Sequence, residues 1–182
     1  IDIRDFGSGN AGTTNAMRVL GKKAGFITYF GDALKAVFAS VLIWAIFKEK
    51  SADYLFILKI YGGLGVVLGH NFPFYLKFKG GKGFASYVGV IFALDWRIAL
   101  AIIAMIFVVT LITDYIVAAT MMTTISAPIS LGLHQGKWIL ALILCIGSAV
   151  ILYRHRENLV RIFITGDEIG LRSASKGEHR VK

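Results

Sequence analysis

The sequence predicts an all-α integral membrane protein, a polytopic bundle of apolar helices. Hydrophobic residues make up 56% of the 182 residues and charged residues only 17%, whereas charged residues make up about 25% of an ordinary soluble domain. The apolar residues also form long blocks without charges, as membrane spans require. Because no Pro- or Ser-rich linker interrupts these blocks, we expect residues 1–182 to form a single membrane-embedded domain.

The residue types also limit the possible partners. A net charge of +9 would point to nucleic acid in a soluble protein. In a membrane protein it fits positively charged cytoplasmic loops and attraction to anionic lipid or substrate, so we expect no nucleic-acid partner. The single cysteine, Cys145, excludes an internal disulfide. No paired His or Cys spacing typical of a metal site occurs, so we expect no metal and no cofactor.

Six apolar segments are expected to form the membrane helices. The first is long enough to cross a hydrocarbon core, which needs about 20 residues. The third segment is short, roughly 16 Å as a helix at 1.5 Å per residue, so it cannot cross without a thinned or protein-lined surrounding. The six segments cover residues 26–47, 54–69, 84–94, 98–113, 115–133 and 138–153.

Positive charges in the loops favour a crossing short helix. If all six segments cross, residues 1–25, the loop before the short helix and the tail 154–182 lie on one side. That side then holds most of the lysines and arginines, and the other side keeps four cations. Because such an excess marks the cytoplasmic face, we expect the N-terminal stretch, the central loop and the tail to be cytoplasmic. The four cations on the other side are Lys48, Lys50, Arg97 and Lys137.

The central loop, residues 69–83, is polar although apolar segments flank it. Gly80, Gly81 and Gly83 let the backbone come close to a ligand. Their amides can line an anion site, to which Lys82 adds a positive charge. The short helix that follows would point its N-terminal amides at the same place. These features predict a phosphate site; a polar loop with membrane-flanking lysines is the alternative.

Two further polar stretches fall on the same side. Residues 7–15 place hydroxyl and amide side chains among glycines, and a helix around Asn15 would put Arg18 on the same face. The planar guanidinium suits a phosphate. In the tail, a helix continuing from the last span would present His155 and Asn158 along one stripe. A turn beside the membrane and a basic surface tail are the alternative interpretations.

Other ionisable residues limit the kinds of reaction that the protein could catalyse. Asp32 and Lys35 lie three residues apart inside the first span, where they can pair. Charges inside a span usually face the bundle interior or water, although a structural pair near the interface is the alternative. The His-x4-Asp arrangement of many lipid acyltransferases is absent, because Tyr75 stands five positions after His70. The stretches therefore hold many anion binders and few candidates for covalent catalysis.

Together these stretches resemble the three motifs of the bacterial acyl-phosphate:glycerol-3-phosphate acyltransferases (PlsY type). Residues 8–15 match the first motif apart from Thr13, where the family has alanine, and residues 69–83 match the second motif throughout. The third motif, His-x-x-Asn followed by Gly-x-Glu, corresponds to His155, Asn158, Gly166 and Glu168. Family members begin with a further membrane helix, so the resemblance implies seven helices in a full-length member and the loss of the first one here.

The resemblance implies transfer of a fatty acyl group from acyl phosphate to the 1-hydroxyl of glycerol 3-phosphate. The products are 1-acyl-glycerol 3-phosphate (lysophosphatidic acid) and phosphate, in phospholipid biosynthesis. The implied setting is the bacterial cytoplasmic (inner) membrane, with the active site facing the cytoplasm and membrane lipid as surroundings. The implied partners are the two substrates, with no obligatory protein partner. The alternative function is a transporter for small anions or phosphate esters, in which the short helix and the glycine loop (residues 80–83 of the central loop) would form the gate.

The resemblance also implies roles for individual residues. As catalytic residues we predict Ser8, Arg18, Lys82, His155 and Asn158. As residues that bind substrate or phosphate we predict Gly9, Asn10, Asn15, His70, Gly80, Gly81, Gly83 and Glu168. Lys82 and the glycine amides would hold acyl phosphate, Ser8 and Arg18 would hold glycerol 3-phosphate, and a substrate phosphate oxygen would accept the hydroxyl proton.

Overall fold

The computed structural model describes residues 1–165 and residue 170, and every regular element in them is helical. The α-helices are α1 (Thr13–Leu20), α2 (Lys22–Phe47), α3 (Ala52–Asn71), α4 (Phe84–Leu94), α5 (Trp96–Thr113), α6 (Ile116–Gln135) and α7 (Trp138–Val160). Short helical turns cover Ile3–Asp5 (η1), Phe74–Leu76 (η2) and Arg161–Thr165 (η3). The all-α class predicted from the sequence is confirmed.

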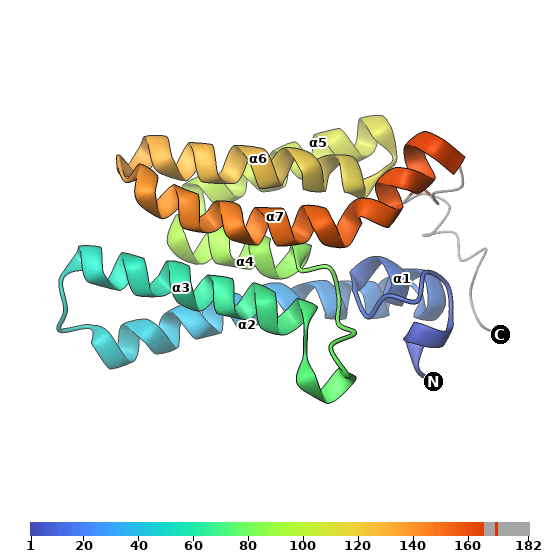
Figure 1. The fold of residues 1–182 in the computed structure, drawn as a ribbon, viewed down its shortest axis with the longest axis horizontal. Helices are drawn as coiled ribbons and strands as arrows, with labels where there is room; N and C mark the ends of the chain where they lie inside the picture. Colours follow the sequence, from blue (N-terminus) through green and yellow to red (C-terminus); the bar gives the residue numbers. More distant parts are fainter. Residues whose placement is uncertain (166–169, 171–182) are drawn as a thin grey trace.

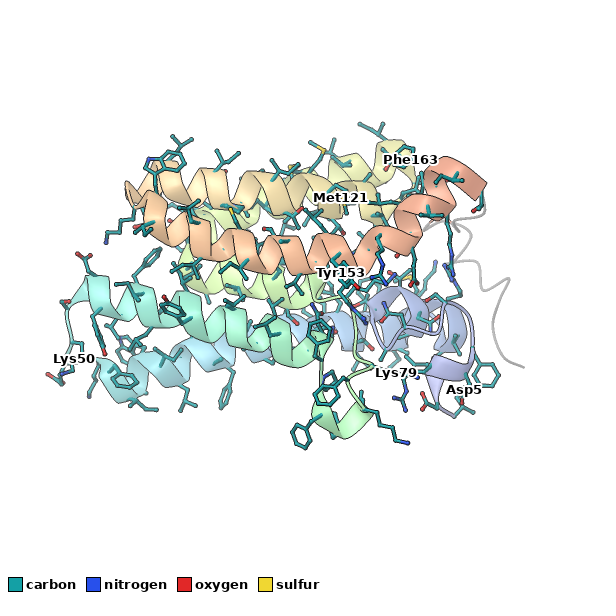
Figure 2. All side chains as sticks on the ribbon, viewed as in Figure 1. Asp5, Lys50, Lys79, Met121, Tyr153 and Phe163 are labelled. Carbon is teal, nitrogen blue, oxygen red and sulfur yellow. The ribbon has the colours of Figure 1, made fainter. Side chains whose placement is uncertain are left out.

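The polar segments gather at one end of the bundle. Helices α2 to α7 run roughly along its long axis, and the α2–α3 and α6–α7 turns lie at one end (Figure 1). The N-terminal segment, α1 and the last turns of α7 lie at the other end, and η2 projects from the side of the bundle toward that end. Figure 2 shows Lys50 at the first end and Asp5 and Lys79 at the second. Three polar stretches that are far apart in sequence therefore share one end, as the charge pattern predicted.

Helix α4 lies inside the bundle. It packs against α2, α3 and α5, and its residues 85–91 are all buried. A helix that is apolar all round belongs either inside a bundle or in contact with lipid. This explains how so short an apolar segment is accommodated: its neighbours cover it.

Glycines allow the helices to approach α4 closely. A Cβ atom on Gly89 would lie 2.2 Å from the carbonyl oxygen of Ala33 on α2, and one on Gly63 of α3 would lie 2.6 Å from Val90 Cγ1. Small residues at such crossings let two backbones come together. Helix α7 is joined to α4 by a buried hydrogen bond of 2.9 Å between Tyr87 and Ser148.

Replacing Gly89 by alanine should destabilise the fold by about 1–3 kcal/mol, because the added methyl group meets backbone that cannot rotate away. Thermal unfolding of the purified protein in detergent measures the effect. Gly65→Ala is the matched control, since no atom lies within 4 Å of a Cβ at that helical position. Alanine there should keep or raise the midpoint, because it favours a helix by about 1 kcal/mol over glycine. Equal midpoints for the two variants would contradict the prediction.

Four described helical segments are long and apolar enough to cross a membrane: Lys22–Phe47, Ala52–Leu76, Trp96–Thr113 and Ile116–Gln135. Their outer faces carry large exposed apolar side chains such as Phe38 and Ile112, as contact with lipid requires. Helix α4 is shorter, and α7 ends in charged residues, so a count of six crossing helices stays a prediction.

Two boundaries differ by more than two residues from those predicted. Helix α2 begins at Lys22 rather than at residue 26, because Gly21, with a φ of 94°, separates it from α1. Helix α7 continues past residue 153 to Val160. The continuation carries His155 and Asn158 on one helix, as the spacing of these residues predicted.

Candidate active site

A cavity of about 450 Å³ opens where the polar segments meet. Its polar lining comes mainly from the N-terminal segment, α1, the glycine loop and α7, with Asp32 from α2 and His70 from α3. Its apolar lining comes mainly from α2, α5 and α6. The polar lining residues include Ser8, Asn10, Thr13, Thr14, Asn15, Arg18, Asp32, His70, Lys82, His155 and Asn158. The apolar ones include Phe26, Phe30, Ile103, Ile106, Phe107, Ile116 and Val117.

The structure brings together most of the site residues predicted from the sequence. All five residues predicted to be catalytic line the cavity, and so do four of those predicted to bind substrate or phosphate, namely Asn10, Asn15, His70 and Gly83. Gly9, Gly80 and Gly81 do not line it. Glu168 lies outside the described residues.

Asn15 organises the N-terminal segment. Its side chain is almost fully buried; Oδ1 accepts a hydrogen bond from the Ser8 amide at 2.8 Å, and Nδ2 donates to the carbonyls of Ile3 and Phe6 at 2.7 and 3.1 Å. Gly7 fits here because its φ is +61° and a Cβ would lie 2.4 Å from Asn15 Oδ1. The amide of Asn15 is thus occupied by backbone. We infer that Asn15 supports Ser8; a direct contact of Asn15 with substrate stays a prediction.

Asn15→Asp should lower kcat/KM by about 10- to 100-fold. The carboxylate keeps the acceptor for Ser8 but loses both donors and faces two carbonyl oxygens, and a buried group left unsatisfied costs about 1–3 kcal/mol. Steady-state kinetics of the predicted acyl transfer, on purified variants, measure the loss. Asp5→Asn, an exposed exchange of the same two residue types in the same segment, is the control and should keep wild-type rates. Full activity of Asn15→Asp would show that the segment does not need this amide.

The glycine loop is shaped by close packing. The Gly80 amide donates to Asn71 at 3.3 Å and the Gly81 amide donates to His70 at 3.2 Å. A Cβ on Gly80 would lie 2.0 Å from the His70 carbonyl oxygen, and one on Gly81 would lie 2.1 Å from His70 Nε2. Both amides already donate to backbone carbonyls, so this geometry does not support the prediction that they hold a phosphate.

The part of the loop that is suited to an anion is its last two residues and the start of α4. Lys82 and Gly83 line the cavity together with Phe84 and Ala85. Gly83 takes a left-handed conformation with a φ of 84° at the N-cap of α4. The first amides of a helix have no partner within it and favour an anion. Lys82 adds a full charge, and its Nζ donates to Oδ1 of Asn158.

His155 faces the cavity with a defined tautomer. Its Nδ1 lies 2.8 Å from the carbonyl oxygen of Ile151. Because a carbonyl oxygen only accepts hydrogen bonds, Nδ1 carries a proton. The other ring nitrogen, Nε2, is left for the cavity. His155 and Asn158 are both largely buried, so α7 presents them as fixed groups.

Asp32, Lys35 and His70 form one cluster beside the glycine loop. Lys35 Nζ lies 2.7 Å from Asp32 Oδ1 and 2.6 Å from His70 Nδ1, and the carboxylate lies 3.2 Å from the same nitrogen. An ammonium has only protons to donate. We therefore assign the His70 Nδ1 as an acceptor and place the ring proton on Nε2, which lies against Gly81.

The N-terminal segment and the central loop are also joined directly. Arg4 lies 3.4 Å from the carbonyl oxygen of Leu76 and forms an ion pair with Asp2 at 2.5 Å. Hydrogen bonds from the Arg4 side chain and amide lower the pKa of Asp2 to about 2. The pair therefore stays charged throughout the physiological pH range.

Sequence reasoning missed two features of the site. Arg154 donates from Nη2 to the carbonyls of Gly80 and Gly81, 3.1 Å each. The neighbouring His155 belongs to the His-x-x-Asn pattern and could be found from it. Arg154 belongs to no such pattern, because its role depends on contacts with a loop that is distant in sequence. The apolar lining was also missed, since Phe26 and Phe107 lie in spans where lipid-facing residues have the same character.

Known proteins resemble this chain over most of its length. Residues 1–165 match the family model described as glycerol-3-phosphate acyltransferase. The glycerol-3-phosphate acyltransferase of Bacillus cytotoxicus is 40% identical over 162 residues, which cover 89% of this chain and 78% of that protein. The enzyme of the same name from Listeria monocytogenes serotype 4a is 37% identical over 161 residues, covering 88% and 79%.

Two crystal structures share the fold. PlsY, an integral membrane glycerol 3-phosphate acyltransferase, superimposes in its glycerol 3-phosphate form with a TM-score of 0.83 at 36% identity, covering 93% of this chain and 82% of that chain. Its lysophosphatidic acid form gives a TM-score of 0.79 at 35% identity, covering 92% and 83%. The chain is therefore a membrane protein, and it belongs to the glycerol-3-phosphate acyltransferase family.

Proposed function

We propose that this chain transfers a fatty acyl group from acyl phosphate to the 1-hydroxyl of glycerol 3-phosphate. The products are 1-acyl-glycerol 3-phosphate and inorganic phosphate. The observation that carries the proposal is the two-part cavity, in which an apolar lining continues into a lining with Arg18 and Lys82. Such a cavity suits a reaction between a fatty donor and a small anionic acceptor. Family membership and the ligands named for the two PlsY structures support the same reaction.

The acyl chain fits the apolar part of the cavity. Side chains from α2, α5 and α6 line this part, among them Phe30, Phe107 and Val117. A fatty chain gains about 0.8 kcal/mol for each CH₂ group that leaves water. The phosphate of the donor would then lie at Lys82 and the first turn of α4, where charge and helix amides favour an anion.

The acceptor fits the opposite polar wall. Arg18 is buried, and its planar fork matches a phosphate group in geometry and charge. Ser8, supported by Asn15, would bind the same molecule, and His155 and Asn158 would orient its hydroxyl groups. Positioning of this kind contributes much of the rate when two reactants must meet.

The reaction then needs charge stabilisation more than a covalent nucleophile. The 1-hydroxyl oxygen attacks the acyl carbonyl carbon, the bond from that carbon to the phosphate oxygen breaks, and an ester bond forms. The hydroxyl proton passes to a phosphate oxygen of the substrates, so no protein base is required. Lys82 stabilises the departing phosphate, a role in which a fixed charge is most effective away from water.

We place the protein in the bacterial cytoplasmic membrane with the site facing the cytoplasm. The end of the bundle that holds the site carries Lys22, Lys23, Lys77, Lys79, Arg154 and Arg156, whereas Lys48, Lys50, Arg97 and Lys137 belong to the other end. Cytoplasmic loops of membrane proteins carry such an excess of positive charge. Acyl phosphate would enter from the membrane and glycerol 3-phosphate from the cytoplasm.

A donor comparison tests the proposed function. The purified protein is incubated in detergent with labelled glycerol 3-phosphate and one of three donors: acyl phosphate, acyl-CoA or acyl carrier protein. We expect labelled lysophosphatidate and an equal amount of phosphate with acyl phosphate only. Product from either thioester in place of acyl phosphate, or label uptake into liposomes without any product, would contradict the proposal.

A further inference from the structure

The loop that carries Lys82 is held by contacts outside the cavity. The amides of Gly80 and Gly81 bond to the end of α3 at 3.3 and 3.2 Å. Their carbonyl oxygens point elsewhere and accept from a different helix, α7. Because Lys82 follows Gly81 directly, whatever fixes these two glycines also fixes the position of its ammonium.

Arg154 holds the loop from α7. Its Nη2 lies 3.1 Å from both glycine carbonyl oxygens, and its guanidinium lies 5.6 Å from the centre of the Phe72 ring. Hydrogen bonds from a charged donor are about twice as strong as neutral ones, and the ring adds a cation–π contact. The next residue, His155, lines the cavity. Arg154 therefore sets the loop relative to the helix that carries part of the site.

Lys35 holds the same loop from α2 through His70. The ammonium donates to His70 Nδ1 at 2.6 Å while Asp32 accepts from it at 2.7 Å. This fixes the ring, whose Nε2 packs so closely on Gly81 that a Cβ there would lie 2.1 Å away. Lys35 and Arg154 are both absent from the cavity lining.

We propose that Arg154 and Lys35 are positioning residues that hold the glycine loop, and with it Lys82, at the phosphate end of the cavity. The inference rests on the proposed acyl transfer, because it names the residues that keep the Lys82 ammonium in place for that reaction. Neither residue touches a substrate in this account. A displacement of a catalytic group by about 1 Å can lower a rate about 100-fold. Replacing either Arg154 or Lys35 should therefore lower kcat.

The first test compares two arginines on the same helix. Arg154→Gln should lower kcat by about 10- to 100-fold, because the neutral side chain cannot bond both carbonyls. Arg156→Gln is the matched control: Arg156 donates to Tyr153 at 2.9 Å and stacks on the Tyr153 ring, and it should keep wild-type kinetics. Arg154→Lys retains the charge and should recover part of the loss. Equal rates for the two glutamine variants would overturn the proposal.

A double-mutant cycle separates positioning from general destabilisation. Arg154→Gln is introduced into the wild type and into a Lys82→Met background, which is assayed at raised enzyme concentration. If Arg154 acts through Lys82, Arg154→Gln should lower kcat by about 10-fold or more in the wild type. In the Lys82→Met background the same substitution should lower kcat by less than about twofold. Lys35→Met should behave in the same way. The same fold loss in both backgrounds would show that these residues act on the fold or on another group.

A third measurement needs no turnover. Acetic anhydride modifies lysine amines, and mass spectrometry of the digested protein gives the modification rate of Lys82. Arg154→Gln should raise this rate several-fold, since the loop no longer holds the ammonium in place, whereas Arg156→Gln should leave it unchanged. An unchanged rate in Arg154→Gln would overturn the inference. An inactive wild type would defeat the proposed function alone, because the modification rates would still report on the loop.

Discussion

Replacing Lys82 by methionine is expected to lower kcat/KM by about 100- to 1,000-fold. Removal of one fixed group that stabilises developing charge costs an enzyme about that much, and the methionine stem fills the same space without the charge. The loss should appear mainly in kcat, because the charge on the departing phosphate grows as the reaction proceeds. Steady-state kinetics with both substrates varied, on protein of confirmed thermal stability, measure it.

Lys79→Met is the matched control for that variant. Lys79 lies in the same loop and is exposed, but it does not line the cavity. It should therefore keep wild-type kinetics within about twofold, since exposed charges interact weakly through water. If both methionine variants lost activity to the same degree, the general charge of this end of the bundle would matter rather than one placed ammonium.

Replacing Arg18 by alanine should raise the KM for glycerol 3-phosphate by about 100-fold. Hydrogen bonds to charged groups contribute about 1.5–3 kcal/mol, and each 1.4 kcal/mol changes a binding constant tenfold. The KM for acyl phosphate should change little, because that substrate is assigned to the Lys82 side of the cavity. Kinetics at saturating acyl phosphate give the first value, and the reverse experiment gives the second.

Arg18→Lys tests whether the planar fork matters as well as the charge. Lysine keeps the charge but offers a single ammonium in place of two parallel N–H groups. We expect an intermediate KM, between the wild type and Arg18→Ala. An unchanged KM for glycerol 3-phosphate in Arg18→Ala would remove this residue from the acceptor site. The acceptor would then have to bind elsewhere in the cavity.

Residues with a distinct chemistry could be found from the sequence. Lys82 and His155 stand out because they belong to polar stretches in a chain whose spans are almost free of charge. Their meeting at one end followed from the number of spans between them, because each crossing changes sides. The helix spacing of His155 and Asn158 then placed both on one stripe, which the continuation of α7 confirms.

Contacts that depend on the tertiary structure could not be found in this way. Gly80 and Gly81 were predicted to bind an anion, since glycine amides are typical of such sites, yet packing against His70 and Asn71 occupies them. The same holds for Asn15, whose amide bonds to the backbone of its own segment. A glycine or asparagine has several uses, and only the neighbouring atoms decide among them.

The apolar half of the cavity could not be predicted from the sequence either. In a soluble protein, an apolar residue on a polar face marks a binding surface. In a membrane helix the lipid-facing side is equally apolar. Phe107 on the cavity wall and Phe38 on an outer face therefore look alike until the helices are packed.

Photo-crosslinking tests most directly whether one cavity holds both a fatty chain and the phosphate-binding groups. The probe is a non-hydrolysable acyl phosphonate with a diazirine on its chain, and mass spectrometry locates the labelled peptides. We expect labels within residues 26–30 of α2 and 103–107 of α5, with labelling reduced by unlabelled acyl phosphate and weakened in Lys82→Met. Labels at the Lys50 end of the bundle, or labelling that acyl phosphate does not reduce, would contradict the account.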